Sequence, residues 1–69
     1  MRVSTVFDIM TDLEEQKPSR IIIETSHKEY TFNMCDGSFD VDIQKELLLL
    51  TDDDGTKWID TSRIECIRV

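Results

Sequence analysis

The sequence has few of the residues that metal sites and disulfide frameworks require. It holds only two Cys and one His among 69 residues. Cys35 and Cys66 have no further cysteines with which to build a framework, which favours a reducing, cytoplasmic setting, with a single bridge between the two as the alternative. A zinc site needs three or four Cys or His ligands at workable spacing, so we expect no metal and no cofactor.

Long hydrophobic runs are also missing. The longest uninterrupted run is Leu47 to Leu50, far short of the about 20 residues that span a bilayer. Residues 1–16 are interrupted by Asp8, Thr11 and Asp12, so they lack the continuous apolar segment of a signal peptide. We therefore expect a soluble cytoplasmic protein that has no targeting segment and binds no membrane.

Basic residues are scarce. Eight Lys and Arg face fifteen Asp and Glu, which gives a net charge of −7. Most of the imbalance lies in residues 36–60, where eight acids face only Lys45 and Lys57. Such a surface cannot neutralise phosphates, so direct nucleic-acid binding is disfavoured and a protein partner with a basic surface is favoured.

The short chain predicts a single domain over residues 1–69. A domain of this size buries only about 60% of the surface that its unfolded chain exposes. The apolar residues are needed for the core, so a deep active site is not expected. A homo-oligomer is an alternative that would add burial.

Residues 3–16 predict an amphipathic helix, because Val3, Val6, Phe7, Met10 and Leu13 recur at spacings of three and four. We expect Ser4 as its N-cap. Pro18 disfavours helical geometry at the residue before it, so the helix should end within two residues of Glu15.

A β-meander is predicted over residues 20–69. RIIIET at 20–25 and EYTFNM at 29–34 form a predicted hairpin around Ser26, His27 and Lys28. Gly37 predicts a turn through its access to positive φ, and Phe39, Val41 and Ile43 then alternate with polar residues. Residues 44–46 predict either a turn or a bend within one long strand.

The Leu47 to Leu50 run lacks alternation and predicts burial on both strand faces, against the barrel interior and the helix. Gly55 ends an acidic turn, and the spacing of Ile64 and Ile67 predicts a short helical step before the last strand. The expected fold class is α+β, with a helix and five or six antiparallel strands in a small barrel or strongly bent sheet.

The segment TKWIDTSRIECI resembles the last corner of Sm-like and Src-homology-type (SH3-like) small barrels. With LLLLTDDDG before it, the stretch is also similar in pattern to small flagellar-operon proteins. The resemblance covers about a third of the chain and implies the architecture alone. The Asp/Asn/Gly RNA-binding motifs of an Sm protein are missing.

Catalytic and calcium-binding chemistry find little support in the sequence. His27 and Cys35 suggest a nucleophilic pair, but His27 lies in a predicted exposed turn. The DDDG turn resembles part of an EF-hand loop, yet Leu50 and Thr61 occupy the first and twelfth ligand positions. We expect no enzyme, unless a dimer interface assembles His27 and carboxylates from two chains.

The expected function is a non-enzymatic acidic module that binds a basic protein surface. Its sharpest version is an inhibitor that mimics nucleic-acid charge, similar to small phage-encoded inhibitors in size and acidity. The alternative is an assembly subunit that self-associates through an edge strand. Trp58 is expected in the core, with an exposed anchor beside the acidic turn as the alternative. The candidate partner-binding residues are Asp36, Asp40, Asp42, Glu46, Asp52, Asp53, Asp54, Trp58 and Asp60.

Overall fold

A computed structural model describes residues 1–69 and shows one N-terminal helix followed by six antiparallel strands. The predicted α+β class and the helix over residues 3–16 are confirmed. In chain order the elements are α1 (Val3–Gln16), β1 (Arg20–Thr25), β2 (Glu29–Asn33), β3 (Ser38–Asp42), β4 (Leu47–Asp52), β5 (Gly55–Asp60), the 3₁₀ turn η1 (Thr61–Arg63) and β6 (Ile64–Arg68).

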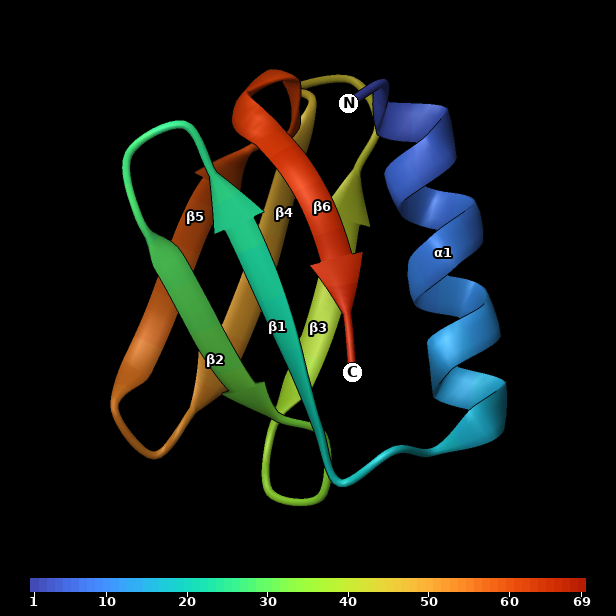
Figure 1. Ribbon diagram of the computed structural model, residues 1–69, viewed down its shortest axis with the longest axis vertical. Helices are drawn as coiled ribbons and strands as arrows, with labels where there is room; N and C mark the ends of the chain where they lie inside the picture. The colour runs from blue at the N-terminus through green and yellow to red at the C-terminus, as the bar shows by residue number, and fades with distance from the viewer.

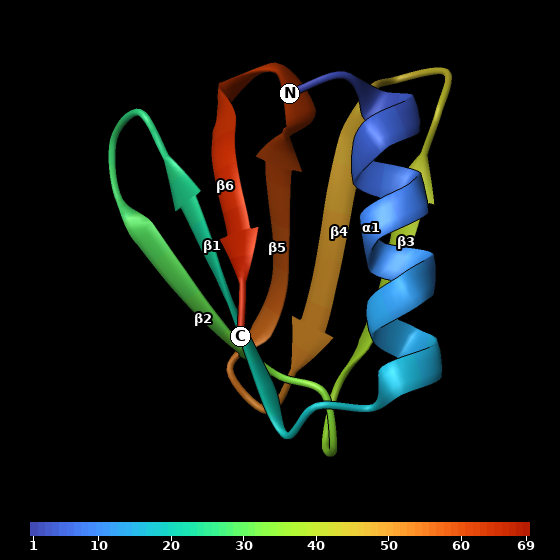
Figure 2. The ribbon, with the colours of Figure 1, turned by 45° about the vertical axis from the view of Figure 1, so that its right-hand side comes forward.

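The strands form two three-stranded sheets and do not close into a barrel. One sheet has the order β2-β1-β6 and the other β3-β4-β5. In Figure 1 the second sheet lies behind the first, and α1 stands beside both on the side where β6 and β3 lie. The turned view in Figure 2 shows the same layers with α1 brought forward. The predicted barrel type is therefore not found.

Two local features keep the sheets separate. Between β2 and β3 the chain turns, and each strand pairs with a different neighbour, β1 and β4 respectively. After β5, η1 carries the chain across to the other sheet, where β6 pairs with β1. The helix packs against β3 and η1, so it covers the side that a barrel would close with strand pairing.

Gly37 has a different role from the one predicted. Its φ is not positive, since Gly55 is the only glycine in that region, with φ 111°. A Cβ at Gly37 would lie 2.6 Å from Cε1 of Phe32 and 2.6 Å from the carbonyl oxygen of Thr51. Glycine is required there by the close approach of β2 and β4 to the turn.

The helix buries Val6, Met10 and Leu13, whereas Phe7 is 45% exposed. The prediction of Ser4 as N-cap was wrong, because the cap position is Arg2 and makes no side-chain bond. The chain start is held instead by the Met1 amine, which donates to the carbonyl oxygen of Ile64 at 2.9 Å. The helix ends as predicted, with Lys17 in the left-handed region before Pro18.

One core lies between the sheets and the helix. It comprises Val6, Met10, Leu13, Ile21, Ile23, Phe32, Leu48, Leu50, Ile59 and Ile64. In the Leu run, only Leu48 and Leu50 are fully buried, and Leu47 and Leu49 are half-buried. The prediction of burial on both faces was wrong, because the helix packs on the same side of β4 as the rest of the core.

The joint before β4 is a turn, which resolves the alternative left open by the sequence. Glu46 adopts a φ of 55° there, and Ile43 is exposed because β3 ends at Asp42. Buried Thr61 fixes this turn to η1, since its N–H and its hydroxyl both donate to the carbonyl oxygen of Glu46, at 3.0 and 3.1 Å. No helix in the structure is long and apolar enough to cross a membrane.

Candidate functional site

The outer face of the sheet β3-β4-β5 gathers several of the candidate residues. The strand register places Asp40 opposite Leu49 and Leu49 opposite Trp58, in one row across the three strands. The next row holds Asp42, Leu47 and Asp60 in the same way. Two rows of the face therefore combine carboxylates with half-buried or exposed apolar side chains.

Trp58 is exposed on this face, and the prediction of a core position was wrong. Its side chain is 63% exposed, whereas Ile59 beside it is only 4% exposed. Neighbouring residues of a strand point to opposite faces, so only one of the two can enter the core. The branched aliphatic Ile59 takes the inner position opposite Leu48, and Trp58 becomes the large apolar residue of the outer face.

The remaining candidate acids lie at the two ends of the sheet. Asp52, Asp53 and Asp54 belong to the β4–β5 turn, at the same end as Asp36 in the β2–β3 turn. Glu46 lies at the opposite end, before β4. The structure therefore brings Asp40, Asp42, Asp60 and Trp58 onto one face and distributes the other acids around its ends.

Three of these carboxylates stabilise local turns. Asp42 accepts the N–H of Lys45 at 3.0 Å, and Asp52 accepts the N–H of Asp54 at 2.9 Å and lies 3.9 Å from the Lys57 amine. Asp60 caps η1 and has the strongest contacts of the three. Its Oδ1 accepts the hydroxyl and the N–H of Ser62, at 2.7 and 3.0 Å.

These bonds lower the pKa of Asp60 below its ordinary value, with the Ser62 hydroxyl as the largest cause and the charge of Arg63 as a smaller one. A carboxylate that accepts hydrogen bonds is favoured in its charged form. Asp60 therefore remains ionised and fixed at the edge of the face.

The other five candidate acids do not stabilise a turn in this way. Asp36, Glu46, Asp53 and Asp54 are exposed, and Asp40 accepts only the N–H of Val41 at 2.9 Å. Because local bonds do not explain these side chains, they are the carboxylates most available to a partner.

Residues weighed for chemistry lie apart from one another. His27 is exposed in the β1–β2 turn, as predicted. Cys35 and Cys66 are both free thiols. Cys66 is half-buried, whereas Cys35 is exposed in the turn after β2. Burial, followed by the neighbouring Glu24, raises the pKa of the Cys66 thiol. No group of three or more His, Cys, Asp or Glu is placed to hold a metal ion.

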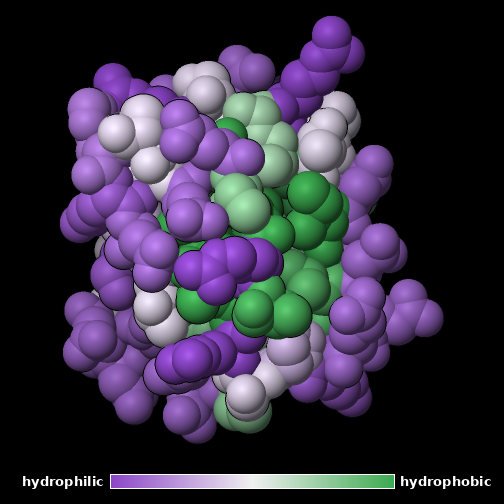
Figure 3. All heavy atoms as spheres, in the orientation of Figure 1, coloured by the Kyte–Doolittle hydropathy of each residue, from purple (hydrophilic) through white to green (hydrophobic).

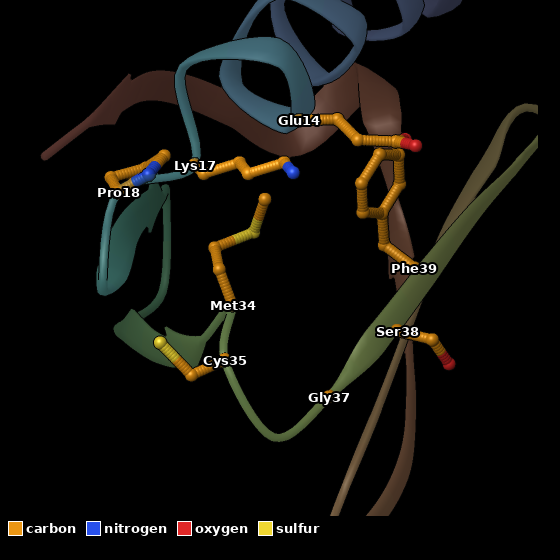
Figure 4. Close-up of a pocket in the computed structure, with 8 residues that line it drawn as sticks. All are labelled: Glu14, Lys17, Pro18, Met34, Cys35, Gly37, Ser38 and Phe39. Carbon is orange, nitrogen blue, oxygen red and sulfur yellow. The ribbon is translucent and has the colours of Figure 1, made fainter.

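A hollow of about 400 Å³ lies between the end of α1 and the β2–β3 turn. In Figure 4 the Met34 and Phe39 side chains point toward the end of α1, where Lys17 and Glu14 lie, while Cys35 and Ser38 point to either side. The hollow thus has an apolar floor with one base and one acid near its rim.

A second hollow of about 370 Å³ was missed by the sequence reasoning. Its lining combines two aromatic rings with basic side chains, and it comprises Thr25, His27, Lys28, Tyr30, Trp58, Ile59, Asp60 and Arg63. The Lys28 amine lies 4.6 Å from the centre of the Tyr30 ring. The residues come from three separate segments, and only the pairing of β1 with β2 and the η1 corner bring them together.

The face of the molecule seen in Figure 3 carries one apolar area, over β6 and beside α1, surrounded by hydrophilic residues. The four large apolar residues with substantial exposure are Phe7, Ile43, Trp58 and Val69. Of these, Trp58 is the one that a strand register places among the candidate acids. Comparison with protein-family models, with curated proteins and with solved structures finds no match.

Proposed function

We propose that the protein is a non-enzymatic binding module that docks its acidic sheet face onto a basic surface of a protein partner. One observation carries the proposal. The outer face of β3-β4-β5 presents Asp40, Asp42 and Asp60 around Trp58, and no Lys or Arg of these strands points to that side, because Lys57 shares the inner face with Ile59.

The composition of this face suits a protein interface. An exposed aromatic residue provides a contact of large area, and surrounding charges set the orientation and rate of encounter. The net charge of −7 would attract a basic partner over distances of about 10 Å at 0.1 M salt.

The sharpest form of the proposal is an inhibitor that occupies the nucleic-acid groove of another protein. Carboxylates held along the ends and middle of a rigid sheet can take the place of phosphates, and the rigid strands reduce the entropy lost on binding. Such an inhibitor requires no cofactor, and the protein itself makes no contact with nucleic acid.

A second candidate, an assembly subunit, is favoured by the open sheets. Because the strands form no closed barrel, β2 and β5 are edges that pair with only one neighbour each. Exposed edges of this kind can add a strand from another molecule.

A competition screen tests the main proposal. Purified nucleic-acid-handling proteins are bound to fluorescent duplex DNA, and this protein is added at about 0.05 M and about 0.2 M salt. We expect displacement of the DNA from at least one basic protein, with weaker displacement at the higher salt. A screen without displacement at low salt would count against the nucleic-acid mimic, and binding that is indifferent to salt would count against the acidic face.

A further inference from the structure

The edge of β5 is the strand edge that the fold leaves most open. β5 pairs with β4 on one side and with nothing on the other. Two of the other edges are partly covered, because α1 packs on β3 and the Met1 amine bonds to the start of β6. Only the edges of β2 and β5 remain open, and β5 alone carries a large exposed apolar side chain, Trp58.

The backbone of β5 is oriented for pairing. The N–H of Thr61 donates to the carbonyl oxygen of Glu46 at 3.0 Å, so this pair is hydrogen-bonded. Hydrogen-bonded and non-bonded pairs alternate along an antiparallel ladder. The bonded positions toward β4 are therefore Ile59 and Lys57, and the N–H and C=O groups of the alternate residues point to the open edge. Those residues are Thr56, Trp58 and Asp60.

Opposite charges lie at the two ends of this edge. The start of β5 follows the acidic turn of Asp52, Asp53 and Asp54. Its end borders the second hollow, where Lys28, Arg63 and His27 lie around Trp58. None of these three basic side chains forms an ion pair within the chain.

We infer that two copies of this chain pair through β5 in antiparallel orientation, about a two-fold axis at Trp58. Antiparallel pairing places the acidic turn of each copy beside the basic hollow of the other, whereas parallel pairing would place like charges together. The register centred on Trp58 sets Thr56 opposite Asp60 of the second copy. The product is a continuous six-stranded sheet with both open β5 edges removed, and an isologous interface of this type closes on itself.

The dimer is a separate claim from partner docking. It uses the backbone edge of β5 and the hollow, while docking uses the acids of the outer face, and Trp58 and Asp60 border both surfaces. Pairing would double the acidic face on one surface. A monomer that binds a basic partner would overturn the dimer alone. A dimer without a basic partner would overturn the docking proposal alone.

Two measurements detect the dimer at about 0.15 M salt. At this concentration the repulsion between the two negatively charged copies is screened beyond about 8 Å, whereas the shorter contacts across the β5 edge persist. Sedimentation equilibrium should show a reversible monomer–dimer transition. The emission of Trp58, the sole tryptophan, should shift to longer wavelength on dilution as the ring becomes exposed to water. A monomer up to several hundred micromolar, with constant emission, would overturn the inference.

Charge exchange tests the orientation. We compare Lys28→Glu/Arg63→Glu with Asp53→Lys/Asp54→Lys, all at exposed positions. Each variant alone should dimerise roughly tenfold more weakly, because its turn and its hollow then carry the same charge and repel each other across the two-fold axis. An equimolar mixture should restore dimers to near the wild-type affinity, because the acidic hollow of one then meets the basic turn of the other.

The matched control for Lys28→Glu/Arg63→Glu is Lys17→Glu/Arg20→Glu, which lowers net charge by the same amount at exposed positions away from β5. It should dimerise much as the wild type does. Far-UV circular dichroism checks that each variant is folded. Equal weakening by the control, or no restoration in the mixture of folded variants, would overturn the antiparallel arrangement.

Discussion

Asp60 combines two tasks at the end of β5. Its side chain lies on the outer acidic face, and the same carboxylate holds η1 through the Ser62 hydroxyl at 2.7 Å and the Ser62 N–H at 3.0 Å. The corner that sends the chain from one sheet to the other therefore depends on an ionised side chain. The sequence motif alone reveals the corner but not this cap.

Replacing Asp60 by Asn should destabilise the fold near neutral pH, because an amide oxygen accepts the Ser62 bonds more weakly than a carboxylate. The folded pKa of Asp60 is lowered from 3.8. Its contribution is thus present above the unfolded pKa and is lost as pH falls through the folded pKa.

The measurement is urea unfolding of wild type and variant at pH 7 and at steps below pH 4. The difference in unfolding free energy should shrink toward the acid end. Asp53→Asn, at the tip of the β4–β5 turn, is the control and should show little difference at any pH. A gap that widens on acidification would contradict the assigned cap.

Gly37 permits the close approach between the β2–β3 turn and the core. An alanine Cβ would lie 2.6 Å from the Phe32 ring and from the Thr51 carbonyl oxygen, both too close for contact without movement. We predict that Gly37→Ala lowers the free energy of unfolding by about 1–3 kcal/mol. Chemical denaturation measures the loss. Ser38→Ala, at the next and exposed position, should be nearly neutral, and equal effects of the two would contradict the steric account.

At the scale of elements, α1 is fixed by three buried side chains and not by its cap. Val6, Met10 and Leu13 enter the common core, while the cap position makes no side-chain bond. The helix period therefore predicted α1, and Pro18 predicted its end. The period was not enough to separate Met10 from Phe7, because both positions fall within the same apolar stripe and only the position of η1 and β3 decides which one is covered.

Met10→Ala should cost about 2–5 kcal/mol, since it removes a fully buried side chain and leaves a cavity. Phe7→Ala should cost much less, because the ring is 45% exposed. Denaturation midpoints of the two variants give the comparison. If Phe7→Ala proved the more damaging, the rotational setting of α1 described above would be wrong.

The strands show where sequence patterns stop being informative. Alternation and turn residues predicted the β1–β2 hairpin, and the pairing confirms it. The Leu47 to Leu50 run could not show its buried face, because four identical residues carry no alternation. The hollow around Lys28 and Arg63 could not be predicted, since it depends on the partner choice of β6, which pairs with β1 and not with β5.

At the scale of the whole molecule, the barrel was the wrong extrapolation from a correct list of elements. Strand count and turn spacing fit both a closed barrel and two separate sheets. What distinguishes them is the helix, which packs beside β3 and η1, and the η1 corner, which is fixed by buried Thr61 through two bonds to the Glu46 carbonyl. The contact between Thr61 and Glu46 joins residues 15 positions apart, and the helix contacts join segments still farther apart in the sequence. Local sequence patterns do not predict such contacts.

The distribution of charge is the feature of the molecule that folding explains least. Asp42, Asp52 and Asp60 stabilise turns, but Asp36, Asp40, Glu46, Asp53 and Asp54 have no comparable role. The proposed docking onto a basic partner would account for their presence on one sheet and its ends. Trp58 at the centre of the same region adds an aromatic anchor that the fold itself does not use.

The most direct test compares two variants that remove the same charge from different faces. Asp36→Asn/Asp40→Asn/Glu46→Gln removes three acidic charges from the sheet face and its ends, without changing the residues of the β5 dimer contacts. Asp8→Asn/Asp12→Asn/Glu15→Gln removes three exposed acidic charges from α1. Affinity for a basic partner from the competition screen is measured for both at about 0.1 M salt. The account predicts at least roughly tenfold weaker binding for the sheet variant and near wild-type binding for the helix variant. Equal affinity of the two variants would contradict it.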